Sequence, residues 1–297
     1  MTTDDGARGE TWTPSARQRE RDAIRRRSAR RSTLTAFVST LVVTAVVVVA
    51  VVNTPGWPRV RKSFLDWDVA VASFPKVLEG LWLNVRVLAV AAIVIFFFAL
   101  LLAICRTLRG PVFFPLRAAA TAYVDLFRGL PLLLVLLVVG FGIPGLRIPG
   151  MTTSPVVLGG IAIILTYSAY VAEVFRAGIE SVHPSQIAAA RSLGLTRAQA
   201  TRHVVLPQAV RRVVPPLLND LVALSKDSGL ISILGAYDAI RAAQVVTSQH
   251  ANFTPYIVAG FLFIALTIPL TRLTDAIARR SGWLGVQSGI AGGGALR

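Results

Sequence analysis

The sequence predicts an all-α, polytopic membrane protein, and three observations point to that class. Hydrophobic residues make up 54% of the 297 residues, and the mean hydropathy is +0.63, which is too apolar for an ordinary soluble domain. The apolar residues gather in runs of roughly 20, the length with which a helix crosses a bilayer core. Basic residues concentrate at the ends of those runs, as they do in membrane proteins.

Six membrane spans can be drawn from these runs. The first, at 34–52, follows a basic stretch but is longer than the roughly 7–15 apolar residues of a signal peptide, so we interpret it as a retained helix. Its many β-branched residues are no objection, because a chain in lipid must satisfy its own backbone hydrogen bonds, as a helix does. The remaining spans are expected at 81–105, 118–142, 156–175, 213–234 and 255–278.

Two spans carry polar interruptions. The sequence Arg128-Gly129-Leu130-Pro131 breaks the third span, and the fifth has Pro215-Pro216 at its start and Lys226-Asp227 near its end. The single cysteine, Cys105, closes the second span, where it is expected to pack as a small apolar residue without a disulfide.

The orientation follows from the placement of the basic residues. The chain has 31 Lys and Arg against 15 Asp and Glu, for a net charge of +16. Arginines gather before the first span, in segments 106–117 and 176–212, and after the sixth span. Six spans place all four groups on one side, which predicts that they and both termini are cytoplasmic. The Arg-rich stretch 15–32 is expected either as a helix lying on anionic lipid or as a disordered tail that enforces orientation.

The segment between the fourth and fifth spans has the signals of two short helices. His183-Pro184-Ser185 begins the first, since proline at the first helical position loses no hydrogen bond. Gly194 is expected to end this helix with a positive φ, and Thr196 to cap the next. Leu206-Pro207 is expected to end the second helix and lead into the fifth span.

The same segment resembles the cytoplasmic signature of ABC-importer permeases, E-A-A-x3-G-x9-I-x-L-P. Ala188-Ala189-Ala190 is followed by Gly194 and then by Leu206-Pro207, with Ala188 standing where the signature has glutamate. The resemblance implies a coupling loop, 176–207, that contacts a partner ATPase. The residues that it assigns to this contact are Gln186, Ala188, Ala189, Arg191, Gly194, Leu206 and Pro207.

A wider pattern narrows the resemblance to the polar amino acid subgroup of glutamate, glutamine and histidine type. Residues 123–131, YVDLFRGLP, are similar to the Y-x-E-x-F-R-G-T-P of that subgroup, and the nearest likeness is to glutamate permease subunits of high-GC Gram-positive bacteria. The resemblance covers about 80–280 and implies a five-helix permease core. The division expected is a cytoplasmic tail at 1–32, an extra membrane helix at 33–53, an extracytoplasmic loop at 54–79, the permease core at 80–280 and a flexible C-terminal tail at 281–297.

The resemblance also implies how the protein works in the cell membrane. It implies an importer subunit for a polar amino acid, glutamate or a relative, delivered by an extracytoplasmic solute-binding protein. A second permease subunit, identical or homologous, would complete the pore. ATP and Mg²⁺ would bind separate ATPase subunits, and this chain would be neither an enzyme nor a cofactor carrier. Accordingly, the sequence has no G-x4-G-K-[ST] phosphate loop, no metal-spaced His/Cys cluster and no readable nucleophile–base pair.

Ionisable and polar residues inside the spans are the candidates for the solute path, because such residues are costly in lipid and usually face a cavity or a partner. Asp125 and Arg128 either pair on one helix face or line the path, and Lys226 and Asp227 either line it or pair at the interface. The full set of candidates is Asn84, Asp125, Arg128, Pro131, Tyr170, Glu173, Lys226 and Asp227.

Two other function classes fit parts of the sequence. The first is a secondary transporter or channel that works without an ATPase. Such folds often carry inverted repeats with paired broken helices, whereas this sequence shows one obvious interruption and no repeat. A membrane-anchored nucleic-acid-binding protein would use the Arg-rich tail and would bind in a salt-sensitive way. This nucleic-acid-binding class does not explain the pattern at 173–230, so no nucleic-acid partner is expected.

Overall fold

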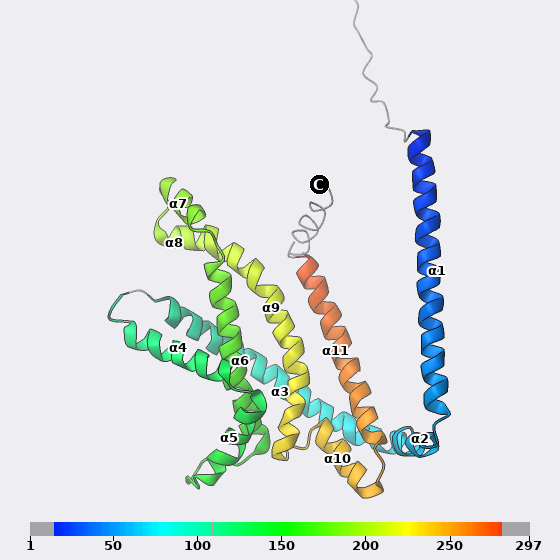
Figure 1. Ribbon diagram of the computed structural model, residues 1–297. Coiled ribbons are helices and arrows are strands. Elements are labelled where there is room, and N and C mark those ends of the chain that lie inside the picture. Colours follow the sequence, from blue (N-terminus) through cyan, green and yellow to red (C-terminus); the bar gives the residue numbers. More distant parts are fainter. Residues whose placement is uncertain (1–14, 109, 281–297) are drawn as a thin grey trace, which may run out of the picture. The chain divides into compact units, whose positions relative to one another are not determined.

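The computed structural model describes residues 15–108 and 110–280, and the described part of the chain is helical with no strand (Figure 1). The chain forms two units that meet in sequence at Arg61 and Lys62. The helices are α1 Ala16–Val52, α2 Trp57–Phe64, α3 Trp67–Thr107, α4 Phe114–Gly129, α5 Leu132–Gly145, α6 Pro155–Glu180, α7 Pro184–Ser192, α8 Arg197–Ala200, a π-helix Thr201–Val205, α9 Leu206–Asp227, a 3₁₀ helix Ser228–Leu234, α10 Ala239–His250 and α11 Thr254–Arg280.

Four described helices or helix runs are long and apolar enough to cross a membrane, and two bent pairs raise the number to six. The first of these, Ser32–Val52, belongs to α1, and no side chain in its apolar window is buried. The Arg-rich stretch before it is helical from Ala16 and continuous with the span. The predicted C-terminal tail lies outside the described residues.

The segment 54–79, expected as an extracytoplasmic loop, is mostly helical and contains α2 and the start of α3. Asp66 caps α3 through its carboxylate, which accepts hydrogen bonds from the backbone N–H of Asp68 and Val69 at 3.1 and 3.2 Å. The segment is also tied to the start of α11, since the N–H of Asp66 donates to Thr254 Oγ1 at 3.1 Å. Ser73 and Val77 are fully buried. Asp66, which lies in the segment expected to be a loop, therefore serves as a helix cap.

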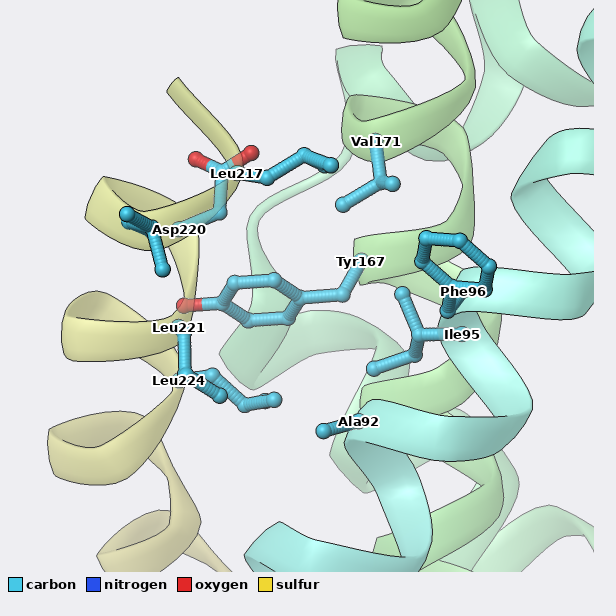
Figure 2. A pocket seen from close by; sticks show the side chains of 10 residues that line it. Ala92, Ile95, Phe96, Tyr167, Val171, Leu217, Asp220, Leu221 and Leu224 are labelled. Atoms are coloured by element: carbon cyan, nitrogen blue, oxygen red, sulfur yellow. The ribbon is translucent and has the colours of Figure 1, made fainter. Parts of the chain in front are cut away.

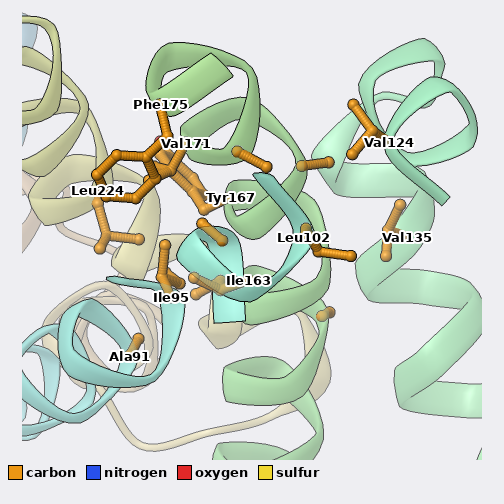
Figure 3. Packing of buried hydrophobic residues seen from close by; sticks show 14 of the residues in the cluster. Ala91, Ile95, Leu102, Val124, Val135, Ile163, Tyr167, Val171, Phe175 and Leu224 are labelled. Atoms are coloured by element: carbon orange, nitrogen blue, oxygen red, sulfur yellow. The ribbon is translucent and has the colours of Figure 1, made fainter. Parts of the chain in front are cut away.

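The main core lies where α3, α4, α5, α6 and α9 meet. Leu136, Ile163 and Val124 are fully buried in it. Figure 3 shows Ile163 and Val124 among the other buried side chains of this cluster. Cys105 is buried in the same cluster. A smaller cluster joins α3 to α10 and α11. Gly80 permits that contact, because a Cβ there would lie 2.4 Å from the backbone carbon of Asp238.

The predicted break in the third span is a sharp turn. Helices α4 and α5 form an angle of 106°, with Pro131 as the residue that precedes α5. Proline lacks an N–H and cannot continue α4, so the chain changes direction at this point. The second bent pair, 48°, joins the fifth span to α10, a helix that the sequence analysis did not anticipate.

Two expectations at the fifth span are wrong. Leu206-Pro207 does not end a helix: the π-helix Thr201–Val205 leads without a gap into α9, which begins at Leu206. The wider π turn accommodates Pro207, whose ring would otherwise meet the carbonyl four residues earlier. Pro215 and Pro216 accordingly lie inside α9 and not at its start.

Candidate functional site

The first helix of the coupling loop has a fixed start and a fixed end. His183 caps α7, with its Nδ1 accepting from the N–H of Ser185 at 3.2 Å. At the other end Gly194 has φ +85°, its N–H donates to the carbonyl of Arg191 at 3.0 Å, and the N–H of Leu195 donates to that of Ala190 at 3.2 Å. These two bonds are the Schellman pattern that closes a helix C-terminus.

The second helix of the loop begins just after this turn. The Thr196 hydroxyl accepts from the N–H of Gln199, and the Gln199 side chain accepts from the N–H of Thr196 at 2.8 Å, so a reciprocal capping box is formed. Only a three-residue connection, at 193–195, separates the α7 C-terminal residue from this cap. The predicted helix, turn and helix are thus confirmed.

The residues that the resemblance assigned to ATPase contact lie on the outer surface of the loop. Ala190, Ala200 and Val205 are buried beneath them and hold the loop together. Leu193 is 84% exposed, an unusual state for leucine, and it lies one residue before the glycine turn. The assigned residues are all exposed: Gln186, Ala188, Ala189, Arg191, Gly194, Leu206 and Pro207.

A cavity of about 210 Å³ lies between α3, α6 and α9 (Figure 2). Tyr167 projects into it from α6, between Ile95 and Phe96 on the α3 side and leucines of α9 on the other. Its volume is below the about 300–1,000 Å³ typical of sites for drug-sized ligands, so it suits a smaller solute.

Two carboxylates of α9 flank Tyr167, which belongs to α6. The tyrosine hydroxyl donates to Asp227 Oδ2 at 2.7 Å. Asp220 lines the cavity, and its Oδ2 is buried without a hydrogen-bond partner. A buried carboxylate oxygen without a partner is costly and is a feature of functional sites. Lys226, predicted together with Asp227, is exposed and makes no ion pair within the described residues.

A second polar cluster lies near the loop end of α6, and it contains Arg128, for which a pair with Asp125 was one of the two expected roles. Glu173 Oε2 accepts from Arg106 Nη1 at 2.8 Å and from Arg176 Nε at 3.1 Å, and Arg128 Nη1 lies 3.7 Å away. Asp125 is exposed, forms no ion pair within the described residues and does not line the cavity, so the structure gives it no place on the solute path. Arg128, in the last turn of α4, thus contacts Glu173 of α6 and not Asp125.

The other candidates for the path are placed as follows. Tyr170 is 40% exposed, and its hydroxyl donates to the backbone oxygen of Arg128 at 3.4 Å. Asn84 is fully buried and donates to Asp238 Oδ2 at 3.1 Å, while its own oxygen accepts from the N–H of Ala239 at 3.1 Å. Asn84 thus connects α3 to the start of α10 and lies apart from the cavity lining.

The sequence analysis missed Asp220 as a site residue, although an acidic residue inside a predicted span was a usable signal. It also missed Asp238, which is fully buried and caps α10 by accepting from the N–H of Arg241. A larger apolar groove of about 890 Å³ runs between the start of α3 and α11 and contains none of the predicted site residues. Within residues 15–108 and 110–280, no three His, Cys, Asp or Glu residues are grouped to hold a metal.

Comparison with known proteins shows which proteins this chain is similar to. The arginine transport system permease protein ArtQ of Bacillus subtilis (strain 168) is 31% identical over 217 residues, which are 73% of this chain and 97% of that protein. The glutamate/aspartate import permease protein GltK of Escherichia coli O157:H7 is 31% identical over 222 residues, 73% of this chain and 98% of that protein.

A solved structure gives the same answer for the fold. A crystal structure of an amino acid ABC transporter with histidines matches with a TM-score of 0.67 and 32% identity, over 72% of this chain and 98% of that one. Residues 110–282 match the family described as the binding-protein-dependent transport system inner membrane component. The resemblance seen in the coupling loop is confirmed, and the chain belongs to the family of binding-protein-dependent transport system inner membrane components.

Proposed function

We propose that this chain is the membrane-spanning permease subunit of an ATP-binding-cassette importer for a polar amino acid. The observation that carries the proposal is the exposed coupling loop, in which a Schellman turn and a capping box hold two short helices with the signature residues facing outward. A loop built in this way suits the transfer of force from a moving partner, because its backbone ends are satisfied internally.

The solute would pass the cavity at Tyr167. An amino acid carries an ammonium group, and Asp220 offers it a buried carboxylate oxygen without a partner. The cavity lining contains no basic side chain that would pair with a second carboxylate. This lining favours a neutral or basic polar amino acid over glutamate, which the resemblance implied.

The partners follow from the family. Two copies of a separate ATPase would bind ATP and Mg²⁺ and contact the coupling loop. A second permease chain would complete the pore, and an extracytoplasmic binding protein would deliver the amino acid. The loop, and with it both termini, would face the cytoplasm, as the arginine distribution predicts.

Reconstitution tests the proposal. The full chain, co-expressed with its ATPase partner and placed in proteoliposomes with the binding protein, should accumulate radiolabelled amino acid only when ATP is supplied on the loop side. Competition among glutamine, arginine, histidine and glutamate then identifies the solute. Uptake of equal rate with and without ATP would instead favour a secondary transporter, and absence of any amino acid uptake would exclude the proposed solute class.

A further inference from the structure

Glu173 gathers three guanidinium groups that come from three different helices. Arg106 reaches it from the end of α3, Arg128 from the end of α4, and Arg176 from one turn further along α6. The carboxylate is 20% exposed, so its interactions are less screened than those of a surface pair. One side chain of α6 thus connects two other helices at the place where both of them end.

The strengths of these contacts differ. Arg106 is 12% exposed and lies 2.8 Å from Glu173, whereas Arg128 is 42% exposed and lies at 3.7 Å. An exposed pair at that distance contributes little free energy and exchanges its partner readily. Arg106 and Arg176 therefore hold the carboxylate in place, and Arg128 is the contact that can be released.

Arg128 is also the residue before the last of α4, which ends at Gly129. Its backbone carbonyl precedes the 106° bend and accepts the Tyr170 hydroxyl at 3.4 Å, while its guanidinium reaches Glu173. Tyr170 and Glu173 are three residues apart on α6, so they share one helix face. The bend between α4 and α5 is thus attached to α6 at two points.

The polar contacts continue from Glu173 toward the coupling loop. Arg176 also pairs with Glu180, the last residue of α6. The next residue, Ser181, accepts a hydrogen bond from Arg212 of α9 through its backbone oxygen. In the other direction Tyr170 packs beside Tyr167, with ring centroids 6.4 Å apart, at the cavity wall. Hydrogen-bond and salt-bridge networks of this kind are the contacts through which coupling between two sites is carried, and a measurement of coupling tests whether this one does so.

We infer that Glu173 is a positioning residue for the α4–α5 bend: it holds Arg128, and with it the bend, against α6, the helix that leads into the coupling loop. This inference rests on the proposed function. Movement of the loop would be passed through α6 to the bend, and loss of the Glu173–Arg128 contact would let the loop move without the bend.

The test compares Glu173→Gln, Arg128→Gln and the matched control Asp125→Asn in the reconstituted importer. The quantity measured is amino acid taken up per ATP hydrolysed, together with the half-saturating amino acid concentration. Arg128→Gln should lower the uptake per ATP by about 2- to 5-fold, the range of an exposed ion pair, and Glu173→Gln should lower it at least as much, both without changing the half-saturating concentration. Asp125→Asn, one turn away on the same helix and without an ion-pair partner in the described chain, should match wild type.

An unchanged uptake per ATP in Arg128→Gln would overturn the inference. A raised half-saturating concentration in Arg128→Gln alone would also overturn it, because Arg128 would then contact the solute. If Glu173→Gln fails to fold, the more exposed Arg128→Gln still decides.

A second measurement does not depend on transport. Amide hydrogen exchange at 132–135 in the detergent-purified full chain should be faster in Glu173→Gln and Arg128→Gln than in wild type and Asp125→Asn. Equal exchange in all four proteins would refute the attachment. If wild type shows no ATP-dependent uptake but exchange changes as expected, the proposed function fails while the role of Glu173 in holding the bend stands.

Discussion

Replacing Gly194 with valine tests whether the glycine turn of the coupling loop transmits movement. Gly194 has φ +85°, and an added Cβ would meet no atom within 4 Å, so the substitution introduces backbone strain without a clash. Holding a non-glycine residue in that conformation costs about 1–3 kcal/mol. The two hydrogen bonds of the Schellman turn contribute about 0.5–1.5 kcal/mol each. The free energy of the backbone strain is about as large as that of the two hydrogen bonds together, so the turn should open in a large fraction of molecules.

The assay is ATP-dependent uptake in proteoliposomes, with Gly194→Asn as the matched control. Asparagine tolerates positive φ, so it should keep the turn and most of the uptake. Gly194→Val should insert normally but lose uptake by about 5- to 150-fold, the change that corresponds to 1–3 kcal/mol. Amide exchange at 193–196 should rise in the valine variant. Uptake by Gly194→Val equal to that of Gly194→Asn would refute the reasoning.

Three further predictions follow from the topology, the packing and the cavity. A cysteine at the exposed Ser185, in a Cys105→Ala background, should resist an impermeant thiol reagent added to intact cells, and strong labelling would reverse the orientation. Gly80→Ala should destabilise the detergent-purified chain by about 1–3 kcal/mol and lower its melting temperature, because the added Cβ would lie 2.4 Å from the Asp238 backbone. The control Gly142→Ala, whose Cβ would meet no atom within 4 Å, should lower the melting temperature less. Asp220→Asn should raise the half-saturating amino acid concentration by about 10- to 150-fold, the loss expected for a hydrogen bond to a charged group, and an unchanged value would remove Asp220 from the site.

The sequence determined the features that depend on neighbouring residues. Apolar runs predicted the spans, because the length of an apolar helix is a local property. Thr196 and Gly194 predicted the cap and the turn of the coupling loop, because both act within one helical turn of their own position. Pro131 predicted the break in the third span for the same reason.

The tertiary structure decided which distant groups meet. Arg106 and Glu173 are 67 residues apart in sequence, and Asn84 and Asp238 are 154 apart, yet each pair forms a hydrogen bond. Arg128 lies 3.7 Å from Glu173 of α6, a residue 45 positions further along the chain, and forms no ion pair with Asp125 on its own helix. The apolar pattern locates helices along the chain without setting their angles, and side-chain partners depend on those angles.

The same limit explains why the helices within 54–79 and α10 were not predicted. Asp66 and Asp238 act as helix caps, and each also contacts a distant helix, Asp66 the start of α11 and Asp238 the first half of α3. A polar residue serves equally well in a loop or at a helix N-terminus. The choice between the two states is made by burial against other helices, which is a non-local energy that the sequence pattern does not contain.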